Sequence, residues 1–181
     1  MRTIGRVAWN AWAAVSLLAL LALAGFGAKA YWTNQQADVD ESGPDDVRFV
    51  INWANLSSAR VDAVEHSHVS PRSLTGDHMD AYAIRISGVP PDAFPLEDGP
   101  TAVRWADGSA ADATLREAIG LVASCASGER LDWFPRGDQL ESARFLVTPW
   151  SVVVHLFRVT SAQLIFYDRQ GGLLYYASCK T

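Results

Sequence analysis

The chain has 181 residues, of which 49% are hydrophobic and 19% charged, and its formal net charge is −5 at pH 7. This length predicts one globular domain together with an N-terminal segment of a different kind. After residue 30 the chain carries twelve basic and all twenty acidic residues, a formal charge of −8, which argues against nucleic-acid binding and peripheral membrane contact, because such a surface repels phosphate groups.

Residues 7–28 form a continuous uncharged run, VAWNAWAAVSLLALLALAGFGA. As a helix rising about 1.5 Å per residue it would cover about 33 Å, enough for the hydrocarbon core of a bilayer. Two interpretations compete. The run is either a single-pass transmembrane anchor or the core of a signal peptide cleaved between Ala30 and Tyr31. We favour the anchor because the run exceeds a signal-peptide core and has Trp9 and Trp12 near its start and Tyr31 and Trp32 just beyond its end.

The charges that flank this run predict its orientation. Arg2 and Arg6 precede it, whereas the segment beyond it is acidic from Asp38 onwards. Basic flanks stay in the cytoplasm, so residues 1–6 are predicted to be cytoplasmic and the rest extracytoplasmic. In a bacterium the anchor would lie in the inner (plasma) membrane and the domain in the periplasm. We expect residues 29–46 to form a flexible acidic stalk and residues 47–181 to form the extracytoplasmic domain.

The first half of that domain is predicted to be mostly β-structure. Residues 47–54 are rich in β-branched and aromatic side chains and read as a strand, with a short helix as the alternative. Residues 60–69 and 78–87 are predicted to form a hairpin around a loop at 70–77, which contains proline and glycine. Residues 88–109 are too rich in proline for a helix or a central strand.

The second half contains the best helix signal and the best strand signals. Residues 110–127 show helical spacing of apolar side chains, with Asp112 as N-cap and Gly128 as C-cap. Strands are predicted at 144–147, 150–159, 163–168 and 173–178, with a turn at 169–172 between the last two. The predicted fold class is therefore α+β, a small domain with an antiparallel β-sheet and one main α-helix packed on one face.

The chain has two cysteines, Cys125 and Cys179. An oxidising compartment would allow them to form one disulfide, and two unrelated core residues are the alternative. Their wide separation does not match a zinc-finger pattern.

The stretch EHSHVSPRSLTGDH, residues 65–78, contains three of the four histidines of the chain. The period of a strand predicts His66 and His68 on one face, with His78 beside them at the loop end of the hairpin. This polar group is predicted to bind a partner or a small ligand, and its members are His66, His68, Arg72, Asp77, His78 and Asp80. As an alternative, His66, His68 and His78 would bind zinc, because three imidazoles suit an open zinc site. Solvated loop histidines are the plainest interpretation.

No catalytic signature accompanies these residues. Neither a GxSxG elbow nor an SxxK motif occurs, and the glycine pair at 171–172 belongs to a predicted turn. We therefore expect a membrane-anchored binding or accessory protein without catalytic activity, such as an immunity-type protein or a subunit of a complex. A basic protein partner would suit its acidic surface, and no cofactor is expected. The alternative is a metal-binding protein or a metal-dependent hydrolase that uses the histidine group.

Overall fold

The computed structural model describes residues 12, 15–29, 42–73, 76–90, 92–95 and 104–181. The chain divides into two compact units, Met1–Ala37 and Asp38–Thr181. In the first unit residues 15–29 form an α-helix whose large apolar side chains are exposed. Across the described residues, no helix combines the length and the apolar character needed to cross a membrane. Residues 1–11 and 13–14 of the predicted N-terminus and anchor, and 30–41 of the predicted stalk, lie outside the described residues.

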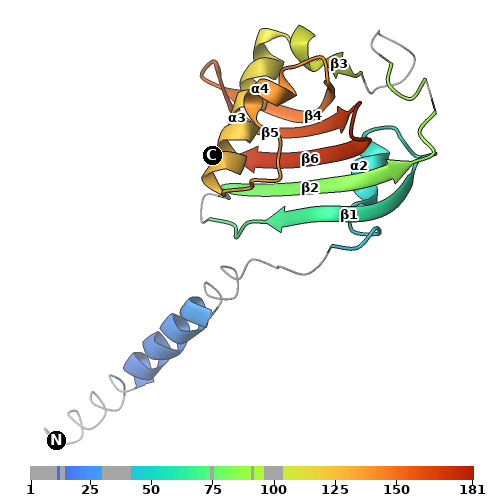
Figure 1. Ribbon diagram of the computed structural model, residues 1–181. Coiled ribbons are helices and arrows are strands. Elements are labelled where there is room, and N and C mark those ends of the chain that lie inside the picture. Colours follow the sequence, from blue (N-terminus) through green and yellow to red (C-terminus); the bar gives the residue numbers. More distant parts are fainter. Residues whose placement is uncertain (1–11, 13–14, 30–41, 74–75, 91, 96–103) are drawn as a thin grey trace, which may run out of the picture. The chain divides into compact units, whose positions relative to one another are not determined.

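An antiparallel sheet forms the centre of the second unit (Figure 1). Within the described residues it has six strands in the spatial order β1-β2-β6-β5-β4-β3. The last strand in the sequence, β6, therefore lies between β2 and β5, where neither of its sides is an edge. The strands are β1 (Arg60–Val69), β2 (His78–Ser87), β3 (Ala106–Asp107), β4 (Phe145–His155), β5 (Arg158–Asp168) and β6 (Leu173–Lys180).

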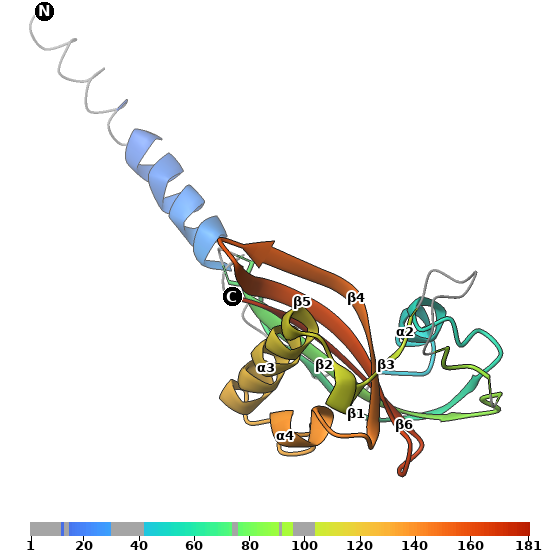
Figure 2. The same cartoon turned by 90° about the horizontal axis from the view of Figure 1, so that it is seen from above.

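Helices cover both faces of this sheet (Figure 2). On one face, called the α3 face here, lie α3 (Ala113–Gly128) and α4 (Gly137–Leu140), and on the other, the α2 face, lies α2 (Arg48–Trp53). The α+β class with an antiparallel sheet is thus confirmed. The prediction of a helix on one face holds for α3, but it missed that α2 forms a second core on the opposite face.

Residues 47–54, predicted as a strand, form α2 and its flanks. The buried side chains are Val47, Val50, Ile51 and Ala54, at the spacing i, i+3, i+4, i+7 that places them on one face of a helix. Their β-branched character favours a strand locally, but burial of this face against the sheet decides the outcome. The strand prediction was therefore wrong, and the short helix considered as its alternative is what forms.

Helix α3 has the predicted N-cap, but it begins at Ala113 rather than at residue 110, and Gly128, predicted as the C-cap, is its last helical residue before the C-cap Glu129. The side chain of Asp112 accepts a hydrogen bond from the backbone N–H of Leu115 at 2.8 Å, as an N-cap residue does. Five apolar residues of the helix are buried against the sheet, namely Leu115, Ala118, Ile119, Val122 and Ala126. A disulfide joins Cys125 of α3 to Cys179 of β6, with 6.4 Å between the two Cα atoms. The helix is therefore held to the sheet by packing and by a covalent bond.

The hairpins agree with the sequence in two cases and differ in one. The predicted strands 60–69 and 78–87 are confirmed as β1 and β2, and a turn at 169–172 joins β5 to β6 as expected. The prediction of one strand over 150–159 was wrong. The chain reverses at Leu156 and Phe157, whose φ angles are +48° and +67°, outside the region that strand residues occupy.

An ion pair fixes the turn that follows β5. The guanidinium of Arg144 donates hydrogen bonds to both carboxylate oxygens of Asp168, at 2.8 Å from Nε. The side chain of Asp168 is 1% exposed, and it also accepts from the backbone N–H of Gln170 at 2.9 Å. The hydrogen bonds from Arg144 hold the pKa of Asp168 below its usual value. A buried charge paired in this way is hydrogen-bonded on both oxygens, which is the condition for tolerating its burial.

Candidate functional site

The six polar residues predicted as a binding group lie on opposite sides of the sheet. In the register of β1 with β2, His66 is opposite Ala83 and His68 is opposite Ala81. Both alanines belong to the core under α3, so the two histidines share the α3 face. His78 is opposite Lys180 of β6, one residue out of phase with Met79, which lies in that same core. His78 therefore belongs to the α2 face, and the three rings do not meet at the loop end.

The two histidines of the α3 face contact residues that follow α3. The ring of His66 stacks on Trp133 with 5.1 Å between centroids. The Nε2 atom of His68 is buried and lies 3.8 Å from a carboxylate oxygen of Glu129. Both rings thus pack against the segment that follows the C-terminal end of α3. In the described residues no group of three histidine, cysteine, aspartate or glutamate side chains is arranged to hold a metal ion.

Three of the remaining predicted residues, Arg72, His78 and Asp80, line a shallow depression on the α2 face, called the polar depression here. Arg72 donates two hydrogen bonds to the carboxylate of Asp80, at 3.0 and 2.6 Å. His78 lies beside this pair, and the depression has a volume of about 490 Å³. Asp77 does not line it; the backbone N–H of Asp77 donates to the hydroxyl of Ser73 at 2.8 Å within the loop.

Hydrogen bonds on both ring nitrogens fix the orientation of His78. Its Nδ1 is 2.8 Å from the carbonyl oxygen of Gly76, and its Nε2 is 3.0 Å from the hydroxyl of Ser178. Since a carbonyl only accepts, Nδ1 carries a proton, and in the neutral ring Nε2 accepts from Ser178. Ser178 is 2% exposed, and burial raises the pKa of its neighbour Tyr176 to about 12. This network holds side chains in place and leaves the serine poorly accessible to a substrate.

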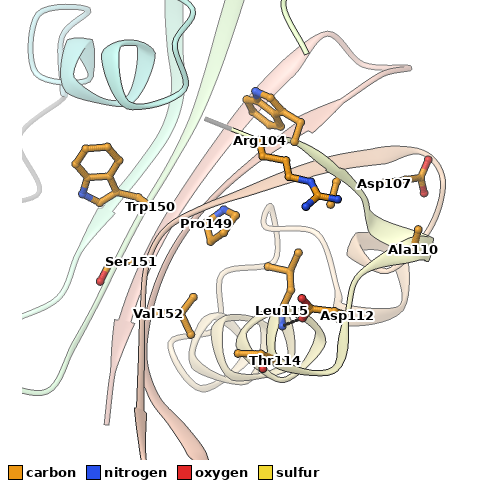
Figure 3. Close-up of a pocket in the computed structure, with 12 residues that line it drawn as sticks. Arg104, Asp107, Ala110, Asp112, Thr114, Leu115, Pro149, Trp150, Ser151 and Val152 are labelled. Carbon is orange, nitrogen blue, oxygen red and sulfur yellow. Dashed lines mark hydrogen bonds between the residues drawn. The ribbon is translucent and has the colours of Figure 1, made fainter. Parts of the chain in front are cut away.

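A second site, which the sequence did not indicate, lies where β3 ends beside β4. It is a cleft of about 630 Å³, called the edge cleft here (Figure 3). Leu115 of α3 and Pro149 and Val152 of β4 supply its apolar surface. Arg104 points into the same space in Figure 3, while Trp150 points to the other side of β4. There Trp150 stacks on Trp53 of α2, with ring centroids 4.5 Å apart.

The charged side chains of the edge cleft are Arg104, Asp107 and Asp112. Asp112 caps α3, and Asp107 accepts from Ser109 and from Arg169, at 3.0 Å in the latter case. Hydrogen bonds from Ser109 lower the pKa of Asp107, so this carboxylate stays ionised. The cleft therefore combines an apolar surface with two carboxylates that already accept hydrogen bonds and one guanidinium, a lining that suits an apolar side chain.

The backbone edge of β4 is open beside this cleft. Strand β3 pairs with β4 only at Ala106–Val147 and Asp107–Leu146. Over residues 149–155, no strand among the described residues pairs with the outer edge of β4. An edge of this kind presents backbone donors and acceptors to whatever approaches. No local sequence motif marks such a site, because it depends on where β3 stops.

Searches among protein-family models, curated proteins and solved structures found no match to this chain.

Proposed function

We propose that this chain is a single-pass membrane protein of the inner membrane whose extracytoplasmic domain binds an extended segment of a protein partner and has no catalytic activity. An accessory subunit of a complex or an immunity-type protein would work in this way. The observation that carries the proposal is the open edge of β4 next to the edge cleft. An extended peptide can add to such an edge as a further strand, with a pocket that accepts one of its side chains.

The chemistry of the edge cleft supports a particular class of partner. The backbone edge supplies hydrogen bonds to any extended peptide, and Leu115 with Val152 supplies an apolar contact. The domain as a whole is acidic, although within the cleft Asp107 is paired with Arg169 and Arg104 supplies a positive charge. A partner segment with alternating apolar residues and a basic residue fits these features best, because complementary charges select the partner and speed its approach.

The membrane anchor is supported by the sequence of residues 7–28 and by the exposed apolar side chains of the helix at 15–29. The wild-type chain is expected to stay in the membrane pellet after extraction with alkaline carbonate. Protease added to intact spheroplasts should digest the domain. Residues 1–6 should become accessible to the protease only after lysis. A shorter soluble product that begins at Tyr31 would show that the run is a cleaved signal peptide instead.

Substitution of Val153 by lysine is expected to weaken peptide binding by roughly tenfold or more, a loss of about 1.4 kcal/mol. Val153 lies on the open part of β4 and is 49% exposed, and a lysine on an edge strand discourages the addition of another strand. Peptides are first selected on the full chain in detergent from a displayed library of short linear sequences. Their affinity for wild type and for Val153→Lys is then measured by calorimetry.

Ser161→Lys is the matched control, because Ser161 is the residue of β5 that pairs with Val153. It adds the same charge on the same hairpin but on a strand whose two edges are both paired, so binding should change little. If no peptide is enriched, or if both substitutions weaken binding equally, the edge is not the binding site. A full chain that is dimeric in detergent and becomes monomeric on Val153→Lys would assign the edge to self-association instead.

A further inference from the structure

The tip of the β4–β5 hairpin, residues 155–158, has a backbone that its side chains do not favour. Leu156 and Phe157 have φ angles of +48° and +67°. A two-residue hairpin turn with positive φ at both positions normally contains asparagine and glycine. Bulky side chains rarely adopt this conformation, and when they do it points to a functional constraint.

The same tip concentrates the exposed apolar surface of the domain. Phe157 is 97% exposed and Leu156 is 79% exposed. In the described part of residues 42–181, every exposed large apolar side chain lies between Trp150 and Phe157, the others being Val153 and Val154. An apolar cluster at one end of a domain with an otherwise polar surface marks a contact with a partner or a membrane.

Local charge at the tip differs from the net negative charge of the domain, which by itself disfavours contact with anionic headgroups. Residues 149–163 contain no aspartate or glutamate, although the chain has twenty acidic residues, and the tip itself carries His155 and Arg158. An acidic group of a neighbouring element, Glu117 of α3, accepts a hydrogen bond from the backbone N–H of Val159 at 3.1 Å, and it offsets part of the positive charge of Arg158. Apolar side chains next to an arginine suit the interface of an anionic bilayer, where the rings enter the acyl boundary and the guanidinium stays with the phosphates.

We infer that the tip of the β4–β5 hairpin inserts Leu156 and Phe157 into the surface of an anionic membrane. The inference rests on the proposed function in one respect, because the anchor would keep the tip close to a bilayer. A segment of the length of residues 29–46 reaches at most about 60 Å when fully extended, so the domain would stay near that surface. Insertion of the tip would then orient the domain and fix the direction in which the edge of β4 faces.

The experiment uses the full chain reconstituted into vesicles of phosphatidylethanolamine and phosphatidylglycerol. An environment-sensitive fluorophore is attached at Val154→Cys, and its quenching by nitroxide-labelled lipids is measured. The expected result is a blue-shifted emission and quenching several-fold stronger than that of the same label at Gln170→Cys in the β5–β6 turn. Vesicles of phosphatidylcholine alone should give a weaker response, because they lack the anionic headgroups that attract Arg158.

The double variant L156N/F157G separates a membrane contact from a structural role. Asparagine and glycine suit the turn, so the urea midpoint should rise above that of wild type, while lipid quenching at residue 154 should fall to the level of the Gln170→Cys label. Unchanged quenching in this variant, or no quenching in wild type, would overturn the inference; the second result would leave protein docking as the use of the tip. If the prediction of a membrane anchor is wrong, the chain will be lost from the carbonate pellet. That result is independent of the quenching measurement, so the two failures can be distinguished.

Discussion

Substitution of both cysteines, Cys125→Ala with Cys179→Ala, is expected to lower the free energy of unfolding by about 4 kcal/mol. The two residues are 54 positions apart in the sequence. Closing a loop of that length lowers the entropy of the unfolded chain, and this loss corresponds to roughly the free energy given above. The bond also joins α3 to β6, the strand at the centre of the sheet. Urea unfolding of the full chain in detergent, followed by tryptophan fluorescence, measures the change.

Reductant provides the control for this prediction. It should lower the urea midpoint of the wild-type chain to near that of the double variant, and it should leave the double variant unchanged. A wild-type midpoint that does not respond would mean that the sulfur atoms are not bonded in the purified protein. Non-reducing electrophoresis of chain taken directly from cells then tests the predicted compartment, because such a bond persists outside the cytosol.

Several elements were predictable from the sequence, β2 and α3 from a clear period and β1 from a run of mixed character before a loop. The bounds of β1 and β2 match the predicted runs, and α3 begins at the residue after its predicted N-cap, Asp112. In contrast, residues 47–54 carry two signals at once, since β-branched composition favours a strand and the positions of the apolar residues favour a helix. Only the sheet surface that buries Val50 and Ile51 decides between them.

The candidate sites were harder to predict because both depend on pairing between distant segments. The period of β1 places His66 and His68 on one face, as the structure has them. The face of His78 depends on the register across the 70–77 loop, and a shift of one residue exchanges the two faces of a strand. The edge cleft requires β3 to end after pairing with only Leu146 and Val147, which no pattern within residues 88–109 indicates.

The hairpin tip was missed for a different reason. A sequence-based prediction recognises a tight turn by glycine, asparagine, aspartate or proline, and the tip has Leu156 and Phe157 instead. Residues 150–159 therefore appeared to be one continuous strand. A turn that forms without turn residues is held by the pairing of the strands on either side, here β4 and β5. Where local preference and the fold disagree in this way, a functional role is the first explanation to test.

Gly108→Ala is expected to lower the free energy of unfolding by about 3 kcal/mol, the upper part of the range for overpacking a buried position. A Cβ atom at Gly108 would overlap the carbonyl oxygen of Leu140 and lie 2.9 Å from that of Ser142. Both are backbone atoms, so neither can rotate away as a side chain would. Relief of the clash must therefore move the segment that contains Asp107 and Ala110, which line the edge cleft. Peptide affinity at the edge of β4 should fall together with stability.

Gly120→Ala in α3 is the matched control, because beyond the neighbouring residues and backbone of its own helix the same added methyl group meets no atom within 4 Å there. Alanine is favoured over glycine within a helix by roughly 0.5–1 kcal/mol, so this substitution should stabilise the domain and leave peptide affinity unchanged. The methyl group thus meets backbone atoms at residue 108 and open space within a helix at residue 120, and urea unfolding should report changes of opposite sign. Equal effects at the two positions would contradict the close packing of Gly108 against α4, and with it the wall of the cleft on which peptide binding depends.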